Sequence, residues 1–531
     1  MLPYRVEASV GPADSAEARE PPTPPRAGAP THRVSGCPHP PTALEGCWRS
    51  AVAAALLTGL GLAGCADPPP PSVILVSFDT TRADRLGAYG NPRGLTPNLD
   101  RFAAQSTVFE HAYTQATVTA PSHTALFTAR YPVGLLRDPR QPQLAGVPTL
   151  AEVLHSYGYA TGAFVGGGDL APEIGLTKGF DTYASPQNFG SFYHTIPPAL
   201  AWLDQQDPAQ PVFAFIHSYD AHNYLHPTPF GYLYADPLAE GSGQEAVRST
   251  VQRIADGRLL PSNQRMALVT ELMLRPLSPA GHALIATQAE LITPPAPPVG
   301  PDDIGLVRDV YDGAVAYADF MFGLLMAGLE ARGILDNAVV IVVSDHGEQL
   351  AEDGFFHHCY TIDEAQAQVV LMIRLPDGAH GGRRATGRVG LIDVMPTVLD
   401  LMGAMAPAGM DGQSLVPALD DPTHPGRTYT YTQGGPLFRS VSVADATGRL
   451  TYAGIPPFDP TLPDMVASAS LPGPGFVAEG GPSAADQARL RDALVAWLRV
   501  APRAADPSQR PLPPELTRSI REHGYFDVDP P

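Results

Sequence analysis

Lysine is almost absent from this sequence. Lys178 is the one lysine, and arginine supplies every other fixed positive side-chain charge. Acidic residues outnumber basic ones, 54 to 34, which gives a formal net charge of -20 at pH 7. The first 64 residues are balanced in charge, so the acidity belongs to the body of the protein. Because an acidic surface repels phosphate backbones, we expect no nucleic-acid partner. An anionic small substrate is not excluded, since a metal ion dominates the field inside its own pocket.

Cysteine and charged residues are also scarce. The four cysteines, Cys37, Cys47, Cys65 and Cys359, show no CxxC pair or other zinc-ligand spacing and indicate no disulfide framework. Charged residues make up 17% of the chain and hydrophobic ones 44%, which is typical of a folded globular protein rather than a disordered one. A chain of 531 residues is long enough to bury a large core.

The N-terminal segment looks like a targeting signal rather than part of the fold. Residues 1–48 are rich in proline and lack periodicity, so we expect them to be disordered or to reflect a start codon placed too early. Residues 49–65 resemble a bacterial lipoprotein signal peptide, in which a short apolar run ends in Leu62-Ala63-Gly64-Cys65. Residues 66–72 form a proline-rich tether. These features predict lipidation of Cys65, a location in the bacterial cell envelope, and membrane contact only through the lipidated N-terminus. A buried Ala/Leu helix is the alternative.

The rest of the chain alternates between apolar strands and helices. Continuous apolar runs of this length favour strands buried on both faces, in a mostly parallel sheet flanked by helices. The predicted strands are residues 73–78, 160–165, 212–216, 338–343 and 369–373, and the predicted helices are residues 96–106, 121–129, 147–157 and 305–332.

Two regions depart from this alternation. Residues 240–300 read as a helical insertion in a catalytic domain that spans residues 73–420. After residue 420 the pattern changes to short alternating segments and a final helix near residues 484–500. Residues 421–531 are therefore predicted to form a C-terminal subdomain, with a small antiparallel sheet plus a helix packed on the main domain.

Polar residues follow three of the predicted strands. Asp79 follows the first strand, His217 opens the segment HSYDAH after the third, and Asp345-His346 follow the fourth. In an open α/β sheet, ligands bind beyond the carboxyl ends of the strands, so these side chains are expected to converge. Two carboxylates and an imidazole suit a divalent metal ion.

A fourth polar cluster surrounds Thr119. Pro121 suits the first turn of a helix, and Thr119 is expected just before that helix N-terminus. The free N–H groups and the dipole of a helix N-terminus favour an oxyanion or a bound phosphate or sulfate group. Thr119 could instead be a capping hydroxyl, and Ser122 is a competing hydroxyl.

These motifs together resemble the sulfatase family of the alkaline-phosphatase-like superfamily. The similar segments, in order and spacing, are SFDTTRADRLGAYG with LTPNLDRFA, TAPSHTALFTARYP, VSDHGEQL, LIDVMPTVLDL and DGQSLVP. The resemblance covers roughly residues 73–417. It implies an alkaline-phosphatase-like α/β sandwich with a small C-terminal sheet.

The resemblance also implies roles for single residues. Asp79, Asp345 and His346 match metal ligands, and Thr119 lies at the nucleophile position, where it would bridge metal and substrate. His222 matches a histidine that assists the leaving oxygen. The remaining matches are His358, at a substrate-oxygen contact, and His123, in place of the family's arginine. One divalent ion is implied, Mn²⁺, Zn²⁺, Mg²⁺ or Ca²⁺; a second, held by Asp220 and His222, is not excluded.

Departures from the family pattern bear on the chemistry. Sulfatases need Cys or Ser in C/S-x-P-x-R, whereas this chain has Thr119-Ala120-Pro121-Ser122-His123. Threonine cannot give the formylglycine aldehyde, so no formylglycine is expected. Thr80 stands where many sulfatases have a second Asp, and residues 161–168, TGAFVGGG, replace the GKWH stretch that supplies a catalytic lysine.

The sequence therefore predicts a metal-dependent hydrolase or transferase that acts on phosphate mono- or diesters through Thr119. The substrate would be a small-molecule, glycan or lipid ester. A sulfuric ester hydrolase and an envelope-binding pseudoenzyme are the alternatives. His217 and Asp220 are interpreted as residues that orient their loop, and one of His357 and His358 is expected to face the site. Residues with a predicted structural role in the loop after the first strand are Arg82, Asp84 and Tyr89.

Overall fold

The computed structural model describes residues 70–500, except for 139–140, 143, 223, 225–300, 351, 353–355, 359–361, 435–439 and 454–474. All of these residues belong to one compact unit, Asp67–Pro531. The predicted N-terminal extension and signal peptide, most of the predicted tether and the predicted insertion at residues 240–300 lie outside the described residues. They remain predictions.

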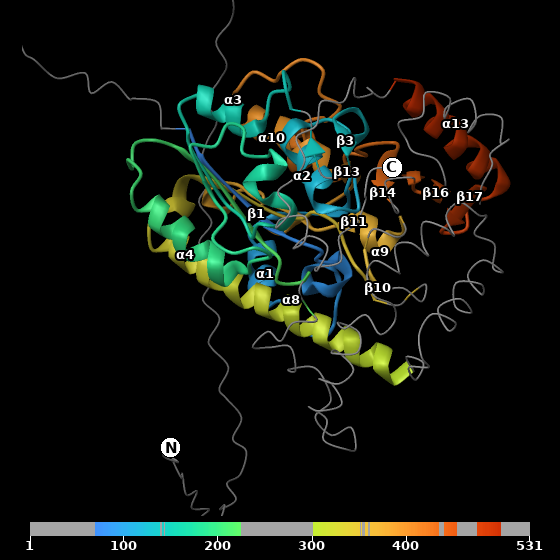
Figure 1. Cartoon of the computed structure of the whole chain (residues 1–531), viewed down its shortest axis with the longest axis horizontal. Helices are drawn as coiled ribbons and strands as arrows, with labels where there is room; N and C mark the ends of the chain where they lie inside the picture. The colour runs from blue at the N-terminus through green and yellow to red at the C-terminus, as the bar shows by residue number, and fades with distance from the viewer. Residues whose placement is uncertain are drawn as a thin grey trace, which may run out of the picture. The chain divides into compact units, whose positions relative to one another are not determined.

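A sheet of nine strands forms the centre of the described structure (Figure 1). Strand β1 (Ser72–Phe78) lies in the middle and pairs in parallel with β7 (Val212–Ser218) and β8 (Ala338–Ser344). On the β7 side the parallel pairing continues to β5 (Ala160–Phe164) and β6 (Thr182–Ala184). The predicted parallel core is confirmed.

The other half of the sheet is partly antiparallel. Strand β12 (Leu371–Arg374) runs antiparallel to β8 and to β2 (Thr107–Tyr113), and β11 (Gln368–Val369) runs antiparallel to β2. Strand β13 (Arg383–Gly390) runs parallel to β2. The strand predicted at residues 369–373 is thus divided into β11 and β12. The break lies at Val370, whose N–H donates to Ser344 Oγ at 2.9 Å.

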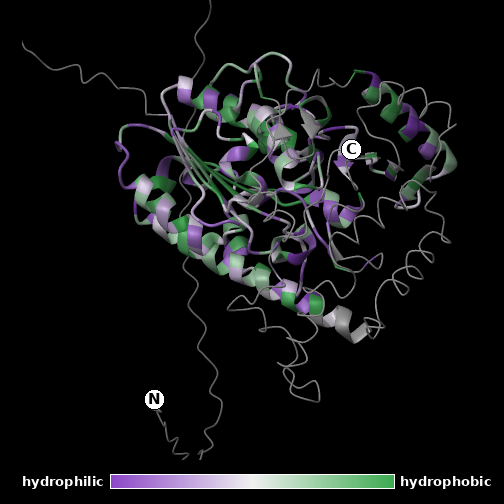
Figure 2. Ribbon diagram, viewed as in Figure 1, coloured by the Kyte–Doolittle hydropathy of each residue, from purple (hydrophilic) through white to green (hydrophobic). Residues whose placement is uncertain are grey.

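Helices cover both faces of this sheet because side chains alternate along each strand. From β1, Ile74, Val76 and Phe78 enter the cluster that contains α1 (Pro97–Ala103), α4 (Phe192–Leu203) and α8 (Pro301–Glu330). Val73 and Leu75 enter the cluster that contains α2 (Thr119–Thr128), α3 (Leu150–Ser156) and α10 (Val394–Leu401). Figure 2 shows the central strands as predominantly hydrophobic, as burial on both faces requires.

Helix α8 is the longest helix of the described residues, and it was predicted at residues 305–332. It is long and apolar enough to cross a bilayer, yet 61% of its apolar stretch is buried within the protein. Together with α4 it packs on the sheet, as the yellow and green helices of Figure 1 show. Its apolar face is therefore accounted for largely by the core.

The C-terminal part forms a second, smaller sheet with a helix. Strands β14 (Thr430–Gly434), β15 (Ser440–Asp445), β16 (Gly448–Ala453) and β17 (Gly475–Glu479) pair antiparallel in that order. Helix α13 (Ala484–Val500) packs on this sheet through Leu490, Leu494 and Trp497. The predicted antiparallel sheet plus helix is confirmed. The remaining short strands and α-helices are β3 (Leu136–Asp138), β4 (Gln141–Pro142), β9 (Gln349–Leu350), β10 (Phe356–His357), α9 (Glu364–Ala367) and α11 (Val416–Asp420).

Candidate metal centre and active site

The three central strands end in register, and this brings the predicted polar residues together. Phe78 lies opposite Ser218 of β7 and Ser344 of β8. Asp79 and Asp345 are the next residues of β1 and β8, so they leave the sheet side by side. The N–H of Asp79 donates to the carbonyl of Ser218 at 3.0 Å, which extends the β1–β7 pairing by one residue.

Asp79, Asp345 and His346 form a buried cluster whose potential ligand atoms all lie within 4.8 Å of one another. Each carboxylate uses one oxygen for protein donors. Asp345 Oδ1 accepts from the backbone N–H of Thr80 at 3.1 Å and of His346 at 2.8 Å. The other oxygens, Asp79 Oδ1 and Asp345 Oδ2, are buried and make no hydrogen bond.

This arrangement fits a divalent cation. Unpaired oxygens of two neighbouring buried carboxylates are costly unless a positive charge joins them. Burial and the charge of Asp345 raise the pKa of Asp79 well above its usual value. His346 Nδ1 lies 2.9 Å from the carbonyl of Gly347 and donates to it, so Nε2 carries the lone pair that a metal ion needs. Asp79, Asp345 and His346 would hold the ion.

Thr119 is the first residue of α2 and lies against this cluster. Its hydroxyl donates to Asp79 Oδ2 at 3.1 Å, and Oγ1 is 3.5 Å from His346 Nε2. The sequence placed Thr119 just before the helix, whereas the helix begins at Thr119 itself and Val118 is the capping residue, without a side-chain cap. The Thr119 hydroxyl therefore faces the candidate metal ligands rather than capping α2.

The neighbouring polar residues of α2 contact protein atoms. Ser122 Oγ donates to the carbonyl of Asp345 at 2.7 Å. His123 Nδ1 donates to the carbonyl of Thr119 at 2.8 Å, and His123 Nε2 lies 3.0 Å from Ser77 Oγ. Burial lowers the pKa of His123, which favours the neutral ring. His123 thus takes the sequence position of the family's arginine with both ring nitrogens bonded inside the protein and without a fixed positive charge.

The ring of His358 contacts the rings of both His346 and His222. The ring centroids of His346 and His358 are 4.5 Å apart, and those of His358 and His222 are 5.1 Å apart. His222 also stacks on Phe189, at 5.8 Å. The structure therefore brings His222, His358, Thr119 and the three candidate metal ligands into one site. The side chain of His357 lies outside the described residues.

His217 and Asp220 have different roles. His217 Nε2 donates to Asp79 Oδ2 at 3.1 Å, and burial lowers the pKa of His217 well below its usual value, so a neutral ring orients this carboxylate. Asp220 Oδ2 instead accepts from the N–H of Phe192, the first residue of α4, at 2.9 Å and from Ser218 Oγ at 2.7 Å. Among the described residues, no second group of three metal-ligating side chains includes Asp220 and His222.

Three residues of this region have no role in the site assigned from the sequence. Asp169 is fully buried, and its charge adds to the larger effects of burial and Asp345 that raise the pKa of Asp79. Glu348 is 0% exposed and lies beside His358. Thr80 has φ +51°, a left-handed conformation that costs a β-branched residue on the order of 1–3 kcal/mol. Glu348 belongs to the SDHGE motif, but its contact with His358 depends on a pairing that no local pattern predicts.

The loop after β1 is held by the residues predicted to be structural. Arg82 pairs with Asp84 at 2.7 Å and with Glu352 at 2.6 Å. The hydroxyl of Tyr89 lies 3.1 Å from the carbonyl of Leu371 in β12. These contacts fix the backbone that carries Asp79 and Thr80.

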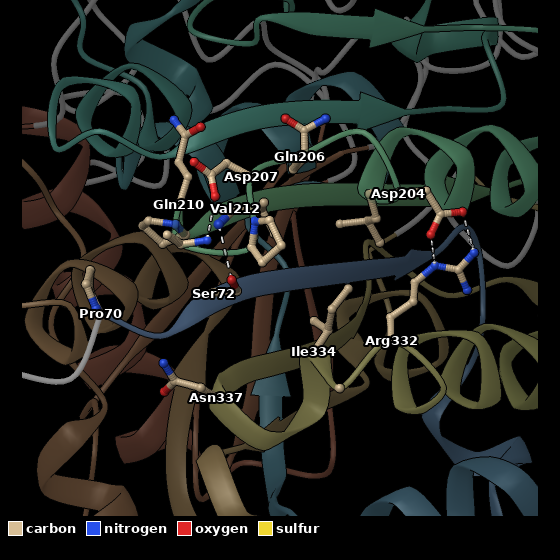
Figure 3. A pocket seen from close by; sticks show the side chains of 15 residues that line it. Pro70, Ser72, Asp204, Gln206, Asp207, Gln210, Val212, Arg332, Ile334 and Asn337 are labelled. Carbon is tan, nitrogen blue, oxygen red and sulfur yellow. Dashed lines mark hydrogen bonds and ion pairs between the residues drawn. The ribbon is translucent and has the colours of Figure 1, made fainter.

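A cavity of about 480 Å³ lies at the other ends of the strands (Figure 3). It is lined by Ser72 and Val212, which begin β1 and β7. Some of its polar groups pair with one another: Arg332 with Asp204 at 2.7 Å, and Ser72 Oγ with the N–H of Val212 at 3.1 Å. The cavity has none of the unpaired buried carboxylate oxygens that mark the candidate metal centre at the carboxyl ends.

Comparisons with known proteins agree with this fold. The chain is 24% identical over 435 residues to the N-acetylglucosamine-6-O-sulfatase of Bacteroides thetaiotaomicron, a match that covers 69% of this chain and 74% of that protein. A shorter match to the N-acetylgalactosamine-6-sulfatase of Rattus norvegicus is 33% identical over 164 residues and covers 27% of this chain and 31% of that protein. The crystal structure of the phosphonate monoester hydrolase of Agrobacterium radiobacter superposes with a TM-score of 0.58 at 17% identity and covers 81% of this chain and 95% of that chain.

A family model defines the relationship. The model described as Sulfatase matches residues 71–404, which is more than half of the chain and includes every residue of the site above. The predicted fold class, an alkaline-phosphatase-like sandwich, is confirmed together with the family. The chain belongs to the sulfatase family and is a hydrolase of that family.

Proposed function

We propose that this protein hydrolyses or transfers phosphate mono- or diesters, with Thr119 as the nucleophile and one divalent cation held by Asp79, Asp345 and His346. One observation carries the proposal: the hydroxyl at the nucleophile position belongs to threonine, and it donates to Asp79 Oδ2 at 3.1 Å. Oxidation of threonine at Cβ gives a ketone, because Cβ carries a methyl group, so the formylglycine aldehyde cannot form here.

The residues of the site support each part of such a reaction. Thr119 Oγ1 attacks phosphorus, the ester P–O bond breaks, and the hydroxyl proton passes to Asp79 Oδ2, its present acceptor. His222 gives a proton to the leaving oxygen. Water then attacks phosphorus and gives a proton to His222, the Thr119 Oγ1–P bond breaks, and Asp79 returns its proton to Thr119; in a transferase an acceptor hydroxyl replaces the water. The cation supplies charge that neutralises the transferred group and lowers the pKa of a nearby hydroxyl.

Two alternative functions can be weighed against the same residues. A sulfuric ester hydrolase is favoured by the names of the curated relatives, which are sulfatases. It is opposed by Thr119 and by the neutral, internally bonded His123 in place of the arginine. A pseudoenzyme that only binds an envelope partner is opposed by the unpaired oxygens of Asp79 and Asp345, which a binding scaffold does not need.

Metal analysis and ester assays of the purified protein test this proposal. Purified protein is analysed for bound metal and assayed with bis-p-nitrophenyl phosphate, p-nitrophenyl phosphate and p-nitrophenyl sulfate. We expect metal-dependent turnover of a phosphate ester, near-background turnover in Thr119→Ala and measurable turnover in Thr119→Ser. Ser122→Ala is the matched control, since its hydroxyl lies on the same helix turn. Faster turnover of the sulfate would overturn the proposal, and protein without metal or activity would favour the pseudoenzyme.

We also propose that the protein is a lipoprotein of the bacterial cell envelope, anchored through Cys65, with a small-molecule, glycan or lipid ester as substrate. The support is the lipobox-like tetrad at residues 62–65 and the proline-rich segment after it. Labelling cells with a fatty-acid analogue should mark the wild-type protein and leave Cys65→Ser unmarked. Equal labelling of both would refute the anchor.

A further inference from the structure

A short hairpin links the candidate metal centre to His358. Strand β9 pairs antiparallel with β10, so that Gln349 lies opposite His357 and Leu350 opposite Phe356. The residues just outside this pairing, Glu348 and His358, therefore meet at the open end of the hairpin. Glu348 also lies two residues after His346, so the hairpin delivers Glu348 and His358 to the same side of the site.

Glu348 contacts His358 from a fixed position. Glu348 Oε2 lies 3.4 Å from His358 Nδ1, while Oε1 accepts from the N–H of Gln349 at 3.2 Å. The Glu348 carbonyl accepts from Arg82 Nη1 at 3.1 Å, and Arg82 is itself held by Asp84. Among the described residues, His358 is the one side chain that bonds the Glu348 carboxyl group.

Both side chains of the Glu348–His358 contact are buried. Glu348 is 0% exposed and His358 is 6% exposed. A buried carboxyl group is unfavourable unless its oxygens are bonded. If packing were the sole role of this position, a leucine or methionine would make the folded protein more stable. The two nitrogens of an imidazole lie on different edges of the ring. When Glu348 contacts Nδ1, the edge of the ring that carries Nε2 faces away from Glu348.

We propose that Glu348 is a positioning residue that holds the His358 ring through Nδ1, so that the Nε2 edge is directed at an oxygen of the transferred group. His358 stands between a candidate metal ligand and the candidate acid, with ring centroids 4.5 Å from His346 and 5.1 Å from His222. A rotation of the His358 ring would therefore move Nε2 relative to both His346 and His222. The assignment rests on the proposed function, because His358 contacts substrate only if the site is catalytic.

A double-mutant cycle tests this assignment. Glu348→Leu removes the hydrogen bond while filling the volume, and His358→Ala removes the ring. We expect each single variant to lose about 10–100-fold in kcat/KM, the range seen when a partner that orients a site residue is removed. The double variant should lose no more than His358→Ala, because Glu348 acts only through that ring. If the loss in the double variant equals the product of the two single losses, the assignment is wrong. Glu348→Gln, which can still contact Nδ1, should recover part of the activity.

Two binding measurements separate this inference from the proposed function. Calorimetric titration with Mn²⁺ alone should give the same affinity for wild type and Glu348→Leu within about threefold; a large loss would mean that Glu348 supports His346 instead. Tungstate binding to the Mn²⁺-loaded protein should weaken equally in Glu348→Leu and His358→Ala. Equal weakening without any ester turnover in wild type would refute the proposed function and retain the positioning role. Asp204→Ala, which removes a carboxylate that pairs with Arg332 at the opposite ends of the strands, should leave tungstate affinity unchanged.

Discussion

Asp345→Asn should make the metal-free protein more stable and remove its response to metal. Asp79 and Asp345 lie in one buried cluster, and each has one oxygen that makes no hydrogen bond. Two unit charges at 4.8 Å, the upper limit within the ligand cluster, repel by roughly 3 kcal/mol at an effective dielectric constant of about 20. Asparagine abolishes this repulsion, and its amide oxygen can keep the two bonds that Asp345 Oδ1 accepts from Thr80 and His346.

The sign of the pH effect follows from the same contacts. Burial and Asp345 raise the pKa of Asp79 in the folded state above its usual value of 3.8. Because the folded state binds the Asp79 proton more tightly than the unfolded state does, Asp79 contributes to folding stability. This contribution is fully present below pH 3.8 and is lost as the pH rises through the folded-state pKa. Metal-free wild type should therefore lose stability toward neutral pH, and Asp345→Asn should lose less.

Metal should remove most of the stability difference between the two proteins. A ligand at 100 times its Kd stabilises the folded state by about 2.7 kcal/mol, equivalent to a rise in Tm of roughly 3–5 °C. Thermal and urea unfolding at pH 7, in chelator and in excess Mn²⁺, should show this gain for wild type and almost none for Asp345→Asn. An equal gain in the variant, or a variant less stable than wild type in chelator, would refute the reasoning.

Three further predictions concern neighbouring residues. His222→Ala should slow alkyl phosphate esters about 10²–10⁴-fold and nitrophenyl esters far less, because only the poor leaving group needs a proton; equal losses would assign His222 to binding. Asp220, whose pKa burial raises from 3.8 to about 6, destabilises the fold as the pH rises from 3.8 to 6. Asp220→Asn should therefore be the more stable protein above pH 6, by on the order of 3 kcal/mol, and an unchanged unfolding curve would contradict this. Ser122→Ala should lower the free energy of unfolding by about 1–2 kcal/mol through the lost bond to the Asp345 carbonyl while kcat changes less than tenfold; loss of all turnover would make Ser122 the nucleophile.

The sequence predicts the centre of the fold better than its edges. Buried parallel strands are apolar along their whole length, so residues 73–78 and 338–343 were recognisable as β1 and β8. Strand β13 was missed because its sequence, RRATGRVG, places arginines where a buried strand has valines. Among the described strands its one partner is β2, and such edge positions tolerate charge.

The same distinction holds within the site. Asp79 and Asp345-His346 could be predicted because each directly follows an apolar strand, and parallel strands end at a common edge. The bond from His217 to Asp79 and the contact of Glu348 with His358 could not, since both depend on side-chain directions. The internal bonds of His123 likewise depend on how α2 packs above Ser77.

Thr119 attacks the substrate in the proposed reaction, and trapping the phosphorylated protein tests this most directly. Wild-type protein is mixed with a phosphate ester in Mn²⁺, quenched in acid during turnover, digested and analysed by mass spectrometry for the peptide that contains residues 117–127. We expect a phosphoryl group on Thr119, present in wild type and in Ser122→Ala and absent from Thr119→Ala. An unmodified peptide together with near-normal turnover in Thr119→Ala would contradict it and leave water as the nucleophile.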